Sequence, residues 1–205
     1  MVTDVGSSGH TGRVTRVSYG DGVSGDDDLH LLGDVSGGKR VVELGISGAY
    51  NSIALAGAGA KAIALDTSAE RIAETRSRAV AAGVAVECHQ GDLGDLGFVP
   101  SGTIDVVVAS HTLGDDDDLG RILRQVHRVL KPSGPFVMAL DHPFAAVGRT
   151  VTRYGEGHRT VGELLTALAR ARFRIEAFHE LHELGAGDVA AVPTTLVVKT
   201  RKEGS

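Results

Sequence analysis

The sequence predicts an α/β fold: a single doubly wound, mostly parallel sheet of seven strands with an antiparallel pair at its C-terminal edge. Short apolar runs alternate with helix-like segments over residues 40–140, which is the rhythm of repeated βαβ units. A glycine turn at Gly45 follows the first of these runs, and Asp66 ends the second. The last two apolar segments lie close together in the sequence, which favours an antiparallel pair.

The strands are predicted from apolar runs bounded by glycine, proline or polar residues. They span residues 40–44, 62–66, 85–89, 103–109, 136–140, 173–181 and 195–199. The run TIDVVVA is apolar enough to lie at the centre of the sheet.

Four helices are predicted between these strands, over residues 48–58, 68–82, 119–130 and 161–170. Ser68 is expected to cap the second helix and Gly83 to end it. The third helix carries its leucine, isoleucine and valine residues on one face, and the KPSG turn then leads into the next strand. Thr160 is expected to cap the fourth.

The N-terminal part divides into an arm and the start of the folded domain. Residues 1–25 are rich in Gly, Ser and Asp and lack periodicity, so we expect a flexible arm there and a single domain over residues 26–205. Acidic residues precede three leucines in residues 26–32, which predicts a short helix that Gly33 stops and that is a candidate lid.

Composition narrows the class of protein. A chain of 205 residues with 42% hydrophobic and 23% charged content is an ordinary globular domain, able to bury roughly 70% of its unfolded surface. A net charge of -5 without a basic cluster argues against nucleic acid as partner. No apolar run could span a bilayer, and the one cysteine, Cys88, fits a reducing compartment. We therefore expect a cytoplasmic protein with a small-molecule partner.

Polar residues follow the predicted strand ends, where loops converge beside a parallel sheet and ligands bind. Asp66 lies about 20 residues beyond Gly45, the spacing at which a carboxylate accepts hydrogen bonds from both ribose hydroxyls. Asp92 is placed to accept from an adenine amine, and Glu43 to face an ammonium group directly or through water. Gly45 and Gly48 let the backbone pass close to a ligand. In the alternative interpretation, Asp66 only caps the following helix and Glu43 only occupies a solvated strand edge.

Four segments carry a resemblance to a known family: VVELGISGAYNSIALAGAGAKAIALDTSAERI, GDLGDLGF, TIDVVVASHTL and ILRQVHRVLKPSGPFVMAL. Together they resemble a class I S-adenosylmethionine-dependent methyltransferase of the small-molecule type, over about residues 38–182. The segment YGEGHRTVGELLTALARARFRIEAFHE is also similar to the C-terminal part of bacterial members. The resemblance implies a Rossmann-like fold, S-adenosylmethionine as cofactor, and transfer of its methyl group to oxygen or nitrogen of a small metabolite.

The resemblance also implies roles for individual residues. Asp66 would bind the ribose, Thr67 would lie against the adenine, and Asp92 with the Leu93 amide would read the adenine edge. Ser110 would line the methionine side. Tyr19 and the helix containing His30 would close over the cofactor.

The glycine turn departs from the family pattern of an acidic residue followed by Gly-x-Gly-x-Gly. Glu43 and Gly45 match the acid and the first glycine, but Ser47 and Ala49 stand at the second and third. Their Cβ atoms fall where the backbone normally approaches the methionine moiety, so weak or altered cofactor binding is expected. The alternative function is therefore a methyltransferase-fold protein without transfer activity, acting as a binding or scaffold module or catalysing another reaction in a biosynthetic pathway. The turn also lacks the Gly-x-Gly-x-x-Gly of a nicotinamide dehydrogenase.

Three histidines are candidates for a general base, which helps when the methyl acceptor is a hydroxyl. His111 and His142 follow strand ends at the open face of the sheet, and His158 lies on a loop that could fold over the pocket. In the alternative interpretations, His111 orients its turn or touches the cofactor, His142 bonds to the backbone, and His158 is a surface residue. The aspartates at 115–118 with His111 could suggest a metal, but a helix N-terminus is the favoured interpretation, and no metal is predicted. The oligomeric state that we consider for this protein is a homodimer.

Overall fold

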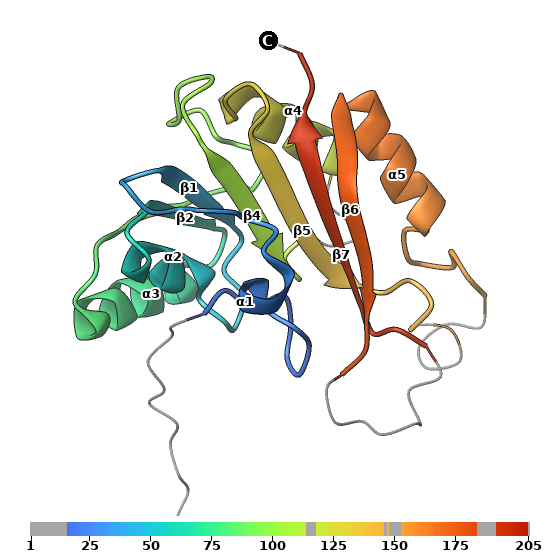
Figure 1. Cartoon of the computed structure of the whole chain (residues 1–205), viewed down its shortest axis with the longest axis horizontal. Coiled ribbons are helices and arrows are strands. Elements are labelled where there is room, and N and C mark those ends of the chain that lie inside the picture. Colours follow the sequence, from blue (N-terminus) through green and yellow to red (C-terminus); the bar gives the residue numbers. More distant parts are fainter. Residues whose placement is uncertain (1–15, 114–117, 146, 148–152, 184–191, 205) are drawn as a thin grey trace, which may run out of the picture.

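The computed structural model describes residues 16–113, 118–145, 147, 153–183 and 192–204. They contain one seven-stranded sheet in the order β3-β2-β1-β4-β5-β7-β6, as the sequence predicted (Figure 1). Its strands are β1 (Arg40–Leu44), β2 (Lys61–Asp66), β3 (Val86–Gln90), β4 (Val106–Ser110), β5 (Pro135–Asp141), β6 (Phe173–Leu181) and β7 (Thr195–Lys202). The first five strands are parallel, and β7 runs antiparallel between β5 and β6.

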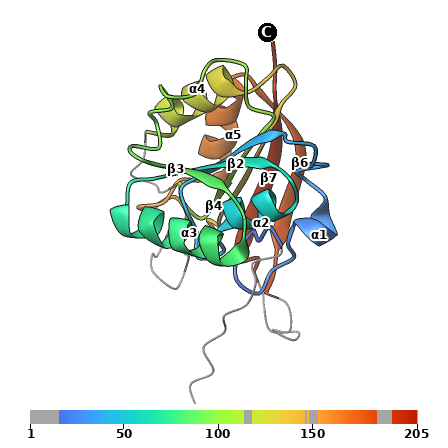
Figure 2. The same cartoon turned by 90° about the vertical axis from the view of Figure 1, so that its left-hand side faces the viewer.

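The helices cover the two faces of the sheet. They are α1 (Asp26–Leu29), α2 (Asn51–Gly57), α3 (Ala69–Ala82), α4 (Leu119–Val129) and α5 (Val161–Arg170). Helices α2 and α3 lie on one face, and α4 and α5 lie on the other (Figure 2). All five residues of β4 are buried, as its apolar run predicted, so this strand forms the centre of the core.

The predicted helix boundaries rest on caps that the structure contains. The Ser68 hydroxyl accepts from the backbone N–H of Arg71, and Gly83 ends α3 in the left-handed conformation. Thr160 and Glu163 form a reciprocal capping box at the start of α5. Asp118 accepts from the N–H of Arg121 and caps α4, whereas the predictions for the aspartates at 115–117 lie outside the described residues.

Residues that the sequence assigned to a flexible arm pack against the sheet. Residues 16–25, here called the N-terminal strap, bury Val17, Tyr19 and Val23 in a cluster with residues of β1, β4 and β5. The predicted arm included this segment because glycine and serine mask the wide spacing of its apolar residues. The domain division itself stays a prediction, since residues 1–15 lie outside the described part of the chain.

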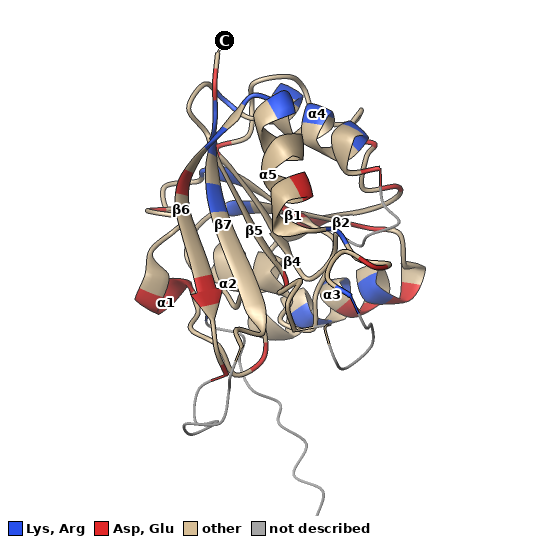
Figure 3. Cartoon of the chain, turned by 90° about the vertical axis from the view of Figure 1, so that its right-hand side faces the viewer, with Lys and Arg blue, Asp and Glu red and all other residues tan. Residues whose placement is uncertain are grey.

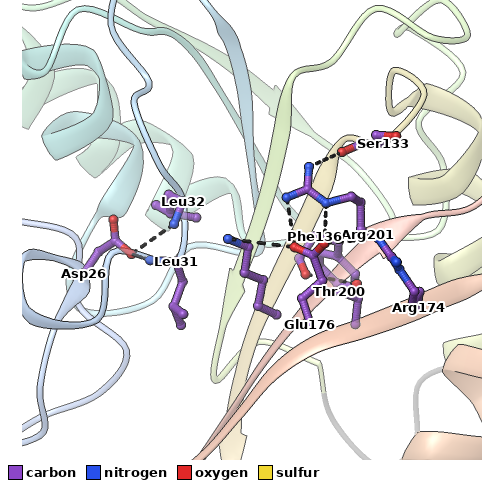
Figure 4. A network of polar contacts seen from close by, with 10 residues as sticks. Asp26, Leu31, Leu32, Ser133, Phe136, Arg174, Glu176, Thr200 and Arg201 are labelled. Atoms are coloured by element: carbon purple, nitrogen blue, oxygen red, sulfur yellow. Dashed lines mark hydrogen bonds and ion pairs between the residues drawn. The ribbon is translucent and has the colours of Figure 1, made fainter.

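Helix α1 is shorter than predicted, because one carboxylate fixes the chain beyond it. The helix ends at Leu29, with His30 left-handed, before Gly33 is reached. An Asp26 oxygen accepts from the N–H groups of Leu31 and Leu32 at 2.7 and 3.1 Å (Figure 4). These bonds compete with continuation of the helix and hold the chain against the sheet.

At the C-terminal edge, β6 and β7 are tied by charge as well as by the backbone. Glu176 accepts from two nitrogens of Arg201 at 2.6 and 2.8 Å, beside a register shift between Ile175 and Ala177 (Figure 4).

Figure 3 shows basic residues dispersed over α3, α4 and β7, with acidic residues among them on α3 and β6. None of the helices in the described ranges is long and apolar enough to cross a membrane.

Candidate active site

Two cavities meet at the C-terminal ends of the parallel strands. The smaller, of about 310 Å³, is lined by the turn after β1 and by residues that follow β2, including Asp66 and Thr67. The larger, of about 720 Å³, is lined by the strap, by residues after β4 and β5, and by the start of α5. Ser47, Gly48 and His111 line both. A single elongated small molecule could therefore occupy both cavities, whose volumes fall in or near the usual range for ligand sites.

The turn after β1 is forced tight by one glycine. Gly45 has φ +75°, and a Cβ there would lie 2.3 Å from the Cβ of Thr112. The Thr112 hydroxyl donates to the Leu44 carbonyl at 2.6 Å, which holds the threonine against the turn. Only glycine fits at this position, so the retained first glycine of the family pattern has a direct packing reason.

Glu43 lies beneath the turn rather than in a cavity wall. It is 1% exposed, and its two carboxylate oxygens accept from the backbone N–H groups of Asn51 and Ser52 at 3.0 and 2.7 Å. Burial raises the pKa of Glu43 to about 7, although the N–H groups at the start of α2 favour the charged form. Any contact with a ligand in the cavities would thus pass through the turn or a water molecule.

Asp66 does line the smaller cavity, with part of its hydrogen-bonding capacity in use. One oxygen accepts from the N–H of Ile46 at 2.6 Å, and the other accepts from the N–H of Ser68 at 2.7 Å. A carboxylate has about four acceptor positions, so capacity remains for ligand hydroxyls. The capping interpretation and the ligand interpretation are therefore compatible. Thr67 and Leu93 line the same cavity.

The Asp92 side chain is 57% exposed, but its carboxylate is engaged by other residues of the protein. Its carboxylate accepts from one nitrogen of Arg121 on α4 at 2.8 and 2.9 Å and from the N–H of Gly94 at 2.6 Å. The Arg121 guanidinium lowers the pKa of Asp92. Asp92 is absent from the described lining of both cavities, so a role at an adenine edge would require it to leave Arg121.

The family pattern for a methyltransferase domain matches residues 41–134 of this chain. Over these residues the chain is similar to S-adenosylmethionine-dependent methyltransferases. A ubiquinone biosynthesis O-methyltransferase from Sodalis glossinidius is 33% identical over 97 residues, which cover 47% of this chain and 39% of that protein. The chain thus spans about two fifths of the length of that curated relative.

Solved structures agree with this family. An S-adenosylmethionine-dependent methyltransferase from Mesorhizobium loti superposes with a TM-score of 0.68 at 29% identity, over 85% of this chain and 95% of that one. The cyclase SpnF superposes with a TM-score of 0.69 at 18% identity, over 93% and 87% of the two chains, and shares the fold alone. The predicted Rossmann-like fold is therefore confirmed.

Ser110 and Tyr19 occupy different environments in the structure. Ser110 lines the larger cavity, and its hydroxyl donates to the carbonyl of Ser18 at 3.2 Å. The Tyr19 side chain is fully buried and its hydroxyl donates to Asp26 at 2.6 Å, while its backbone carbonyl contacts the His111 ring. The aromatic ring therefore anchors the strap instead of covering the cavities.

His111 stands where the two cavities meet and is bonded at both ring nitrogens. Nδ1 contacts Asp141 at 2.7 Å, and Nε2 contacts the carbonyl of Tyr19 at 2.7 Å. Both partners are acceptors, so the doubly protonated ring satisfies both bonds. The hydrogen bond to Asp141 raises the pKa of His111, against the opposing effect of burial. This state has no lone pair with which to accept a proton.

His142 is also fully engaged, and His158 borders the larger cavity. His142 is 1% exposed; its Nδ1 accepts from the N–H of Phe144 at 3.1 Å, and its Nε2 donates to Glu180 at 2.9 Å. His158 lines the cavity from the loop before α5. The pKa of Asp141 is lowered, mainly by its hydrogen bond with His111 and to a smaller extent by His158. Within the described residues, no cluster of His, Cys, Asp and Glu is suited to hold a metal ion.

Several residues at the site had no sequence signal of their own. Asn51, Thr112 and Arg121 each bond to a partner far along the chain, and Arg71 lines the smaller cavity from α3. Periodicity places such residues on an element but cannot place them against a distant loop. The Gly45-Thr112 contact alone had an indirect signal, in the retained glycine.

Proposed function

We propose that this protein transfers the methyl group of S-adenosylmethionine to oxygen or nitrogen of a small metabolite. The observation that carries the proposal is the pair of joined cavities at the strand ends, with Asp66 in the smaller one. The curated relative that shares 33% identity is an O-methyltransferase of ubiquinone biosynthesis, which supports oxygen as the acceptor atom.

The residues present fit the cofactor in the smaller cavity and at the junction. Asp66 would accept from the ribose hydroxyls, and Thr67 and Leu93 would flank the adenine. Gly45, Ser47 and Gly48 would lie along the methionine part, with Glu43 beneath them acting on its ammonium group through water. Ser47 lines both cavities and Ala49 lines the larger one, and each carries a Cβ where the family pattern has glycine. This supports the prediction of weakened binding.

The cofactor supplies a methyl group already activated on a sulfonium, so the protein mainly orients the acceptor and excludes water. The larger cavity would hold the acceptor between the strap and the start of α5. The three candidate bases, His111, His142 and His158, all line this cavity. In the structure, hydrogen bonds occupy both ring nitrogens of His111 and of His142, so either residue would have to give up one of these bonds to act as base.

Calorimetric titration with S-adenosylmethionine and S-adenosylhomocysteine tests the proposal. Asp66→Asn should weaken binding of both by roughly tenfold to a hundredfold, because it removes the charge that accepts the ribose hydroxyls. Asp34→Asn, at an exposed carboxylate on a loop before β1, is the matched control and should leave affinity unchanged. Absence of binding at millimolar ligand would reject the methyltransferase proposal.

The alternative proposal is a protein of this fold without methyl transfer. It is supported by the substitutions at Ser47 and Ala49 and by the likeness in fold to the cyclase SpnF. Methyl transfer from radiolabelled S-adenosylmethionine to a bacterial metabolite extract separates the two proposals. Cofactor binding without any labelled product would favour the alternative.

A further inference from the structure

The strap is held over the larger cavity by a built set of hydrogen bonds. The N–H of Ser18 donates to Oδ1 of Asn51 at 2.8 Å, and Nδ2 of Asn51 donates back to the Ser18 carbonyl at 2.9 Å. Ser110 donates to the same carbonyl. Asn51 is fully buried at the start of α2, so one strap residue is tied to both α2 and the end of β4.

His111 adds a bond of a different kind one residue further along. Nε2 of the ring donates to the Tyr19 carbonyl, and Nδ1 donates to Asp141. A positive charge on the ring therefore strengthens the hydrogen bond to the strap. His111 has φ +54°, a left-handed backbone that places the ring across the junction. Loss of one proton would leave a lone pair facing either a carboxylate or a carbonyl, and one of the two bonds would be lost.

The strap is shaped to meet this ring. Gly20 has φ +148°, and a Cβ there would lie 2.8 Å from Nε2 of His111. Ser18, Gly20 and Asp21 line the larger cavity, and His111 lines both cavities. The contact between His111 and the strap therefore borders the space that a ligand would occupy.

We propose that His111 is a positioning residue whose doubly protonated ring clamps the strap over the junction of the two cavities, with Asn51 and Ser110 as uncharged partners. The clamp is fully formed when His111 carries both protons and weakens when pH rises and one is lost. The charged groups that act on it are Asp141 of β5 and Asp21 of the strap, with His158 acting on Asp141. The proposal rests on the proposed function only for the identity of the ligand beneath the strap.

The sign of the pH dependence follows from the partners. Asp141 raises the pKa of His111, so the folded protein keeps the second proton at a pH where an unfolded chain has released it. The stabilising bond is complete below the ordinary histidine pKa and is lost as pH rises through the raised one. Protection of the strap amides from hydrogen exchange should therefore decrease as the pH rises through the raised pKa of His111.

Hydrogen-deuterium exchange of peptides from residues 16–25 tests the clamp without any ligand. After correction for intrinsic exchange, wild-type strap opening should increase on the order of tenfold between about pH 6 and about pH 9. His111→Gln keeps one uncharged donor and cannot titrate, so its strap should be more open than wild type at about pH 6 and insensitive to pH. Asn51→Ala should open the strap at both pH values and keep the wild-type ratio. His89→Gln, at a histidine on β3, is the matched control.

Two outcomes would overturn the proposal. Equal strap protection in wild type and His111→Gln at about pH 6 would show that the ring does not clamp the strap. A tenfold pH effect that persists in His111→Gln would assign it to another group. Titration with S-adenosylhomocysteine on the same variants then tests the linked ligand: no binding at any pH rejects the proposed function, while the exchange result still decides the clamp.

Discussion

Substitution of Gly45 by alanine should destabilise the fold far more than the same change three residues away. The new Cβ would lie 2.3 Å from the Cβ of Thr112 and 2.6 Å from its hydroxyl oxygen, at φ +75°. Left-handed backbone costs a residue with a Cβ about 1–2 kcal/mol, and the displaced Thr112 hydrogen bond costs about 1 kcal/mol. Steric overpacking adds about 1–3 kcal/mol. Together these terms predict a loss of about 3–6 kcal/mol.

Gly48→Ala is the matched control, because it lies in the same turn with no atom within 4 Å of an added Cβ. Its φ lies outside the positive range, so it should leave stability unchanged or raise it slightly. For a domain of this size the loss in Gly45→Ala corresponds to a Tm lower by roughly 6–24 °C. Thermal unfolding followed by circular dichroism measures both variants.

A double substitution separates the close contact from the backbone strain. Thr112→Gly removes the atoms that the new Cβ would meet, so the penalty of Gly45→Ala should be smaller in that background by the steric part. Equal melting temperatures for Gly45→Ala and Gly48→Ala would refute the packing argument. An unchanged penalty in the Thr112→Gly background would locate the cost in the backbone alone.

Three further changes test the fold. Thr160→Ala removes the capping box of α5 and should cost about 1 kcal/mol in urea unfolding, whereas Thr160→Ser should cost little. Tyr19→Phe deletes the 2.6 Å bond to Asp26 and should cost about 1.5–3 kcal/mol, against a smaller loss for Tyr154→Phe, whose ring is partly exposed. Burial raises the pKa of Glu43 from 4.5 to about 7, so unfolding free energy should fall, on the order of 3 kcal/mol, as pH rises across that interval, and Glu43→Gln should abolish the fall.

The sequence predicted the sheet well because its signals are local. Four of the five parallel strands, β1, β2, β4 and β5, are short and largely apolar runs. Asp66, Ser110 and His111 end or follow such runs, so they could be placed at one edge of the sheet. Gly83 and Ser68 act within a few residues of the helix that they delimit. These features need no knowledge of distant partners.

The orientation of side chains at that edge could not be predicted, because it depends on partners far along the chain. Asp92 follows its strand as expected, but Arg121 on α4 draws its carboxylate away. His111 meets Asp141 and the Tyr19 carbonyl, which are 30 and 92 residues distant. A strand end fixes where a residue stands, while tertiary packing decides what its polar atoms bond to.

Glu43 lies beneath the turn that carries Ser47 and Gly48, and His111 lies at the junction of the two cavities. Titration of these two groups predicts a bell-shaped pH profile for the affinity for S-adenosylhomocysteine. Affinity should rise as pH passes about 7, because charged Glu43 favours the ligand ammonium, and should fall when His111 releases the strap. Calorimetry across pH should show Glu43→Gln without the acid limb and His111→Gln without the alkaline limb. An alkaline limb that survives His111→Gln would belong to the ligand amine, and the strap would then have no part in retention.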